Sequence, residues 1–213
     1  VVRLVGSEMC IRDRYIFSQD HKMIAKQYLF TGVFFMGIIG ILMSALMRMQ
    51  IAWPEEPNIF FDFLLGKWAP EGVMDADIYL ALVTMHGTIM VFFVLTAGLS
   101  GTFSNLLIPL QLGARDMASG FLNMIAFWLF FLSTVIMVAS IFVEAGPAAA
   151  GWTIYPPLSA LEMAQPGSGL GMTLWLVSMA FFIASSLLGS LNYIVTVLNP
   201  VSYTHLTLPT TYH

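Results

Sequence analysis

The stretch YLALVTMHGTIMVFFVLTAGLSGTFSNLL, from Tyr79 to Leu107, decides the fold of this chain. It contains no Asp, Glu, Lys or Arg, and it is longer than the roughly 20 residues that a helix needs to cross a bilayer. Backbone groups in lipid must bond within their own segment, so the stretch predicts a membrane-spanning helix. Three further apolar stretches predict spans at about Tyr28–Met47, Phe121–Val143 and Met172–Leu198.

The composition supports this interpretation. The 213 residues are 58% hydrophobic and only 9% charged, with a mean hydropathy of +0.83. Soluble domains carry about 25% charged residues, so a soluble enzyme and a disordered segment are excluded. Eight Lys+Arg against twelve Asp+Glu offer no basic surface to nucleic acid. The single Cys10 permits no intramolecular disulfide. The expected fold class is all-α, a polytopic transmembrane helix bundle in a lipid membrane.

The positions of Lys and Arg predict the orientation of the bundle. Lys22 and Lys26 precede the first span, and Arg115 lies between the second and third spans. The link between the first two spans carries six acidic residues against Lys67, and the last link has no Lys or Arg. We therefore expect both chain ends and the second link on the cytoplasmic side. The first link is expected outside, as an interfacial loop with the aromatic anchors Trp53 and Trp68.

The two ends of the chain fit neither a targeting peptide nor the helical pattern. VVRLVGSEMCIRDR (Val1–Arg14) and VSYTHLTLPTTYH (Val201–His213) resemble translated sequencing-library adapter. We expect residues 1–14 and 201–213 to be non-native, and residues 15–200 to be part of a longer membrane protein.

Polar residues inside spans are candidates for function. His86 lies about seven residues into the second span, and Gly87 leaves the helix surface beside its imidazole bare. Imidazole is a common ligand of haem iron, yet a core histidine or one lining a transporter cavity fits the position too. Arg48 ends the first span, where it suits a snorkelling side chain or a cation directed at a cofactor.

A second group of polar residues lies in the inner halves of the spans. Asp116 enters the third span, where it suits either the helix N-terminus or a proton entry point. Asn123 follows seven residues later, so we expect it two helical turns deeper on the same face. The side chains above Asp116 are compatible with hydrogen bonds between helices or with a file of waters. They are Asn105, Asn123, Ser185, Ser186 and Asn192.

These residues belong to an ordered set of motifs. The motifs are DHK (Asp20–Lys22), MR (Met47–Arg48), IYLALVTMHGTIMVFF (Ile78–Phe93), SNLLIPLQLGARDMA (Ser104–Ala118), NMIAFW (Asn123–Trp128), VEAGPAAAGWTIYPPLS (Val143–Ser159) and SSLLGSLN (Ser185–Asn192). Through them the segment from His21 to Asn199 resembles subunit I of the haem–copper terminal oxidases, most closely the A-type cytochrome c oxidases.

The resemblance implies a role for each candidate. It makes His86 one axial ligand of the low-spin haem and Arg48 a hydrogen-bond donor to a substituent of that haem. It places Tyr79, Trp152 and Tyr155 near the haem propionates. It makes Asp116 the mouth of the D proton channel and sets the other inner polar residues along it, namely Asn105, Asn123, Ser185, Ser186 and Asn192.

The resemblance also implies the activity of the parent protein. Such a subunit has twelve helices, reduces dioxygen to water with electrons from cytochrome c and pumps protons. It works with subunits II and III in the bacterial inner membrane. In the family the second axial histidine, the ligands of the high-spin haem and the copper ligands lie on later helices. We therefore expect this four-helix segment to contain no catalytic residue and to be inactive alone.

Two alternatives remain. A quinol oxidase of the same superfamily is disfavoured because GVMDADIYLALV, residues 72–83, lacks the histidine expected near a quinol. A transporter fragment would show internal repeats and broken helices, and the sequence shows no such repeat.

Overall fold

The computed structural model describes residues 12–54, 56–161, 163 and 169–198. Of the two tails predicted to be non-native, residues 1–11 and 201–213 lie outside these ranges. Within them the chain is helical and contains no strand. Four helices are long and apolar enough to cross a membrane, which confirms the predicted class of polytopic helix bundle. They are His21–Ala52, Ala76–Leu112, Gly120–Ile141 and Leu170–Leu198.

The first two spans are continuous helices with a wider, π-helical middle. The first comprises α2 (His21–Tyr28), η2 (Leu29–Met36) and α3 (Gly37–Ala52). The second comprises α5 (Ala76–Thr88), η5 (Ile89–Leu99) and α6 (Ser100–Leu112). The third and fourth spans are α7 (Gly120–Ile141) and α8 (Leu170–Leu198).

Capping residues set the ends of the helices, outside the apolar stretches. Asp20 caps α2, and its carboxylate accepts a hydrogen bond from the Lys22 amide at 2.9 Å. Gly113 ends α6 in the left-handed conformation, with φ at 66°. Ser119 caps α7, where its hydroxyl accepts from the Leu122 amide at 3.2 Å.

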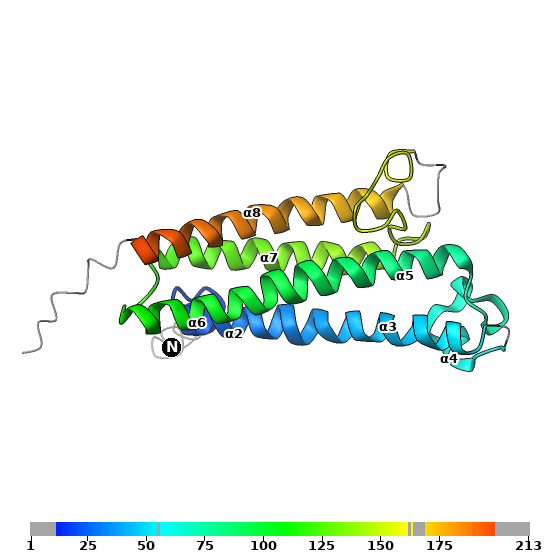
Figure 1. Ribbon diagram of the computed structural model, residues 1–213, viewed down its shortest axis with the longest axis horizontal. Helices are drawn as coiled ribbons and strands as arrows, with labels where there is room; N and C mark the ends of the chain where they lie inside the picture. The colour runs from blue at the N-terminus through cyan, green and yellow to red at the C-terminus, as the bar shows by residue number, and fades with distance from the viewer. Residues whose placement is uncertain (1–11, 55, 162, 164–168, 199–213) are drawn as a thin grey trace, which may run out of the picture.

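The four spans form two antiparallel hairpins (Figure 1). In the first hairpin α2 packs on α6, η2 on η5 and α3 on α5. In the second hairpin α7 packs on α8 along its length. Contacts of α2 with α7 and of α6 with α8 join the two hairpins.

The two helices of the first hairpin come into backbone contact at a pair of glycines, Gly32 and Gly98. A Cβ built on Gly32 would lie 2.5 Å from the Gly98 Cα, so the two backbones touch where η2 crosses η5. Helices in lipid gain little from hydrophobic burial, and small residues allow the close approach that gives them van der Waals contact instead.

Two side-chain clusters bind the spans together. Tyr28 stacks on Phe130 with ring centroids 5.2 Å apart, and Phe93 lies 6.0 Å from Phe130 and 5.3 Å from Phe182. Ser133 and Ser178 interlock α7 and α8, because each hydroxyl donates to the backbone oxygen of the other residue, at 2.8 and 2.7 Å.

The two ends of the bundle differ (Figure 1). The start of α2, the link between α6 and α7 and the end of α8 lie at one end, which we call the inner end. The links around α4 and after α7 lie at the other, outer end. This grouping of links agrees with the predicted topology, and the side of the membrane that each end faces stays a prediction.

The first link contains a helix that the sequence analysis did not predict. Asn58 caps α4 (Ile59–Leu65), followed by the short turns η3 (Gly66–Trp68) and η4 (Pro70–Gly72). A five-residue π-helical turn, η1 (Arg12–Ile16), precedes the first span. Ile59 and Phe63 are each 86% exposed. An exposed apolar face of this kind suits a helix lying at the membrane surface.

Candidate functional site

His86 is anchored to the neighbouring span through one ring nitrogen. It lies half-buried on α5, and its Nδ1 is 2.9 Å from the backbone oxygen of Gly40 on α3. A carbonyl oxygen only accepts, so Nδ1 carries the proton and Nε2 of a neutral ring keeps its lone pair. Within the described residues no hydrogen bond occupies Nε2. The imidazole therefore has the tautomer and the hydrogen bond that are typical of a histidine that binds metal through Nε2.

Two glycines shape the surroundings of this imidazole. Gly40 is buried, and a Cβ on it would lie 2.6 Å from the Met90 Sδ. The sequence predicted a bare surface beside His86 because Gly87 has no side chain. The Trp152 ring lies against that surface, with its Cδ1 3.9 Å from where a Cβ of Gly87 would be.

The link after α7 and the helix α8 are each fixed to α5 beside His86. The Gly151 amide donates to the Thr84 hydroxyl at 2.9 Å. One turn further along α5, the Thr88 hydroxyl accepts from the Trp175 indole at 3.1 Å. Both threonines are buried. These bonds hold the link and α8 beside the helix that carries His86.

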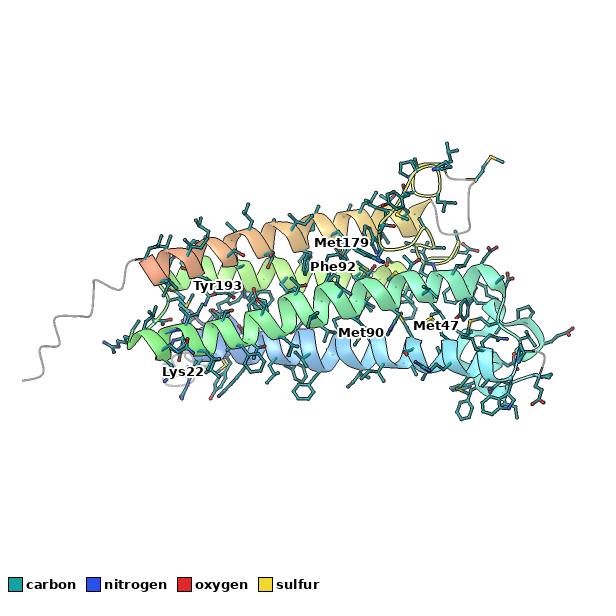
Figure 2. The ribbon with its side chains drawn as sticks, viewed as in Figure 1. Lys22, Met47, Met90, Phe92, Met179 and Tyr193 are labelled. Carbon is teal, nitrogen blue, oxygen red and sulfur yellow. The ribbon has the colours of Figure 1, made fainter. Side chains whose placement is uncertain are left out.

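The aromatic candidates lie near His86 without bonding to it. Trp152 is 53% exposed and packs on Phe92, with ring centroids 5.9 Å apart. Trp152 and Tyr155 line an open groove of about 590 Å³ with Phe92 and Met179, which lie close together in Figure 2. Tyr79 is partly buried against the core, two helical turns before His86.

Arg48 lies apart from His86. It occupies α3 eight residues after Gly40, about 12 Å further along the helix. Its side chain is exposed, and no hydrogen bond or ion pair within the described part of the chain engages it. The structure therefore does not bring the two predicted haem-binding residues into contact.

Asp116 lies in the link before α7 rather than on that helix. Its Oδ1 accepts from the backbone amides of Met117, at 2.7 Å, and of His21, at 3.3 Å. The His21 Nδ1 lies 3.2 Å from the same oxygen. Because α7 begins at Gly120, helical spacing does not relate Asp116 to Asn123, contrary to the sequence-based expectation.

The two inner asparagines form a pair between α6 and α7. Both are fully buried, and the Asn123 Nδ2 donates to the Asn105 Oδ1 at 2.6 Å. The Asn105 Nδ2 donates to the Gly101 oxygen at 2.7 Å and to the Tyr193 hydroxyl at 3.0 Å. We call Asn105 and Asn123 the amide pair.

The polar residues of α8 bond mainly to the backbone of α7 and of the link before it. The Ser185 hydroxyl donates to the Ala126 oxygen at 2.6 Å. The Asn192 carboxamide accepts from the Ser119 amide at 3.0 Å and donates to the Ser119 oxygen at 3.1 Å. These two side chains join helices. Ser186 is exposed instead and faces a cavity.

This cavity has a volume of about 160 Å³ and lies between the first, second and fourth spans. We call it the serine-lined cavity, after its hydroxyl-bearing side chains, which are those of Tyr28, Thr96, Ser100, Ser185, Ser186, Ser190 and Tyr193. It is large enough to hold several waters.

Buried polar atoms without partners lie near the same region. Among the described residues these are the His21 Nε2, the Asn123 Oδ1 and the Trp128 Nε1. Buried polar groups are nearly always satisfied by protein or by ordered water. The Asn123 Oδ1 therefore marks a position for a water beside the amide pair.

Sequence reasoning missed two residues of the inner cluster. His21 precedes the apolar stretch and is therefore not among the predicted candidates, yet it contacts Asp116. Tyr193 was not singled out, although it is a polar side chain directly after Asn192 inside an apolar span. The polarity of a phenol within a span was the available signal.

Comparison with known proteins identifies the family. A family model described as Cytochrome C and Quinol oxidase polypeptide I matches residues 23–211. The chain is 43% identical, over 185 residues, to an alternative cytochrome c oxidase subunit 1 of Bradyrhizobium diazoefficiens. It is 40% identical over 185 residues to a cytochrome c oxidase subunit 1 of Thermostichus vulcanus.

A third relative is a haem–copper oxidase subunit I+III of Aeropyrum pernix, 37% identical over 184 residues. The alignments cover 87%, 87% and 86% of this chain and 29%, 29% and 20% of these three relatives. The chain therefore spans less than a third of their length. With most of its residues matched by the family model, the chain belongs to the cytochrome c and quinol oxidase polypeptide I family, the subunit I family of the haem–copper terminal oxidases.

Proposed function

We propose that this chain is the part of a cytochrome c oxidase subunit I that supplies one axial ligand of the low-spin haem and the inner part of the D proton channel. The parent protein would reduce dioxygen to water and pump protons. The observation that carries the proposal is the bond from the His86 Nδ1 to the Gly40 oxygen.

The residues around His86 fit a haem. The Gly40 oxygen fixes the tautomer and the direction of the ring, so that Nε2 is the ligating atom. An iron porphyrin with two axial histidines accepts and releases single electrons without an open site for oxygen. The high-spin haem and the copper belong to the parent protein and would take their ligands from residues outside this chain.

Arg48, Tyr79 and Trp152 would serve the periphery of the same haem. Arg48 is charged, exposed and unengaged within the described residues, so its guanidinium is available to a polar substituent. Tyr79 and Trp152 lie toward the outer end of the bundle from His86, where each offers one hydrogen-bond donor. Their role is to orient the macrocycle rather than to react.

Cytochrome c is favoured over quinol as the electron donor. A groove of about 240 Å³ between α3, α5 and α7 is lined by apolar side chains, including Ile39, Met43, Ile78 and Leu82. A bound quinol would need convergent polar groups to hold its headgroup. Among the described residues, no charged or carboxamide side chain lines this groove.

The inner polar residues are proposed to carry protons from the cytoplasm. Asp116 is part-exposed at the inner end, so its carboxylate can exchange protons with water. The amide pair, the partnerless Asn123 Oδ1 and the serine-lined cavity provide polar positions above it. Ser185 and Asn192 would hold α8 against α7 and the link before it, and so fix the helices that border this path.

The setting of the parent protein follows from the family. We propose that it lies in the bacterial inner membrane with its inner end toward the cytoplasm, where Lys22, Lys26 and Arg115 are found. Subunits II and III are its proposed partners. One of the relatives above is named as a subunit I+III.

The experiment that tests this function uses the complete parent subunit purified with its partners. The reduced-minus-oxidised optical spectrum should show a six-coordinate low-spin haem. Oxygen uptake should be rapid with reduced cytochrome c and slow with ubiquinol. The reverse donor preference would support the quinol oxidase, and absence of haem would contradict the proposal.

The Gly40 oxygen gives a prediction about the haem environment. In Gly40→Ala the new methyl group would lie 2.6 Å from the Met90 Sδ and 3.3 Å from the Ile89 Cγ2, so these side chains or α3 must shift, and we expect the bond from His86 to the Gly40 oxygen to lengthen. Losing a partner of this kind typically costs about 10- to 100-fold in metal affinity or activity. We expect a shifted low-spin haem potential, measured by spectroelectrochemical titration, and recovery in Gly40→Ala/Met90→Ala. A potential unchanged in the single variant would contradict the role of this bond.

A further inference from the structure

The Tyr193 hydroxyl connects two parts of the inner cluster that are otherwise separate. It accepts a hydrogen bond from the Asn105 Nδ2 at 3.0 Å. It also lines the serine-lined cavity together with Ser186 and Ser190. Tyr193 lies near the inner end of the bundle, as does Lys22 (Figure 2). One side chain of α8 therefore touches both the amide pair and the cavity.

The bond to Tyr193 completes the hydrogen bonding of Asn105. The two hydrogens of its Nδ2 go to the Gly101 oxygen and to the Tyr193 hydroxyl, and its Oδ1 accepts from Asn123. A carboxamide held at three points cannot rotate without breaking bonds. The orientation of Asn123, and of its partnerless Oδ1, follows from that of Asn105.

The hydrogen of the Tyr193 hydroxyl remains available. No described residue accepts it, while the oxygen is occupied by Asn105. A hydroxyl that accepts on one side donates on the other. Because Tyr193 lines the serine-lined cavity, a water there can accept this hydrogen.

We propose that Tyr193 is a positioning residue of the proton path, which holds the amide pair and orders the water of the serine-lined cavity against it. This inference rests on the proposed function of the inner cluster. The phenol itself neither gains nor loses a proton overall. It keeps waters on the two sides of Asn105 in one hydrogen-bonded file.

The test uses Tyr193→Phe in the complete oxidase, because this change removes one oxygen and keeps the ring. Haem content is measured from the optical spectrum, turnover by oxygen uptake per haem, and the solvent isotope effect by repeating turnover in D2O. We expect unchanged haem content, turnover about fivefold lower, as for the loss of one hydrogen bond, and a larger isotope effect. Protons pumped per electron in vesicles should also fall.

Ser133→Ala is the matched control. Ser133 also bonds a hydroxyl across to α8, yet it lies outside the inner cluster. A loss of helix contact alone would change both variants alike, and only a role in proton movement raises the isotope effect in Tyr193→Phe. Tyr193→Gln offers Asn105 an acceptor oxygen again and should recover part of the turnover.

The outcomes separate the two proposals. If the wild-type protein binds no haem or takes up no oxygen, the proposed function fails whatever Tyr193 does. If the wild type is active and Tyr193→Phe keeps its turnover and isotope effect, or behaves as Ser133→Ala does, the role of Tyr193 is overturned. If Tyr193→Phe binds no haem, Asn105→Ala is measured instead, because it removes the other partner of the same hydrogen bond. A solvent isotope effect equal to that of the wild type in Asn105→Ala would also overturn the role of Tyr193.

Discussion

Replacing His86 with alanine in the complete subunit is expected to abolish the low-spin haem spectrum and oxygen uptake. The Gly40 oxygen holds Nδ1, so Nε2 alone is free to ligate, and no other described histidine lies within the spans near it. Loss of the hydrogen-bond partner that orients a ligating histidine costs about 10- to 100-fold in metal affinity or activity, and loss of the ligand itself should exceed that. The measurement is the reduced-minus-oxidised spectrum of purified protein, with oxygen uptake recorded on the same sample.

His21→Ala is the control for this prediction. His21 lies at the inner end and bonds to Asp116, far along the bundle from His86. Its replacement should leave the low-spin spectrum intact, whatever it does to turnover. A six-coordinate low-spin spectrum that survives in His86→Ala would refute the assignment of His86 as the ligand.

Replacing Gly32 with leucine is expected to prevent assembly of the subunit. The first atom of any side chain would lie 2.5 Å from the Gly98 Cα and 3.1 Å from the Phe93 oxygen. These are backbone atoms and cannot turn aside, so the first and second spans would have to separate. Overpacking a well-packed core by single methylenes costs typically about 1–3 kcal/mol, and leucine adds far more. Membrane fractions should contain little haem-loaded protein.

Alanine provides the comparison within the same helix. Gly37 is also buried, yet a Cβ there would meet only the Val94 Cγ2, at 4.0 Å. Gly37→Ala should therefore accumulate as the wild type does, while Gly32→Ala should lose thermal stability measured by haem retention on heating. Equal stability of the two alanine variants would show that the backbones at Gly32 and Gly98 are free to separate.

The spans and their alternating directions could be predicted because backbone groups in lipid must bond within their own segment. Uncharged stretches such as Tyr79–Leu107 therefore form helices, and consecutive spans cross the bilayer in opposite directions. The helix caps extend each prediction by a few residues. The π-helical middles of the first two spans could not be predicted, since hydropathy does not distinguish a π-helical stretch from an α-helical one.

The candidate site was only partly predictable. His86 stands out in a sequence because an imidazole in lipid is costly, but the partner of its Nδ1 is a backbone oxygen, which no pattern of side chains reveals. Helical spacing failed at Asp116, since the helix begins after it. The interfacial loop predicted between the first two spans contains the helix α4, which its own IFFDFLL run and the Asn58 cap favour.

The two hydrogen bonds between Asn192 and Ser119 also bear on the order in which such a subunit folds during translation. Asn192 and Ser119 are 73 residues apart in the chain, and Thr196 adds a third bond to the same link by accepting from the Ala118 amide. A ribosome delivers the link that carries Asp116 well before it delivers α8. The mouth of the proposed proton path therefore takes its final shape only after the fourth span has entered the bilayer, because α8 supplies the side chains that bond to this link.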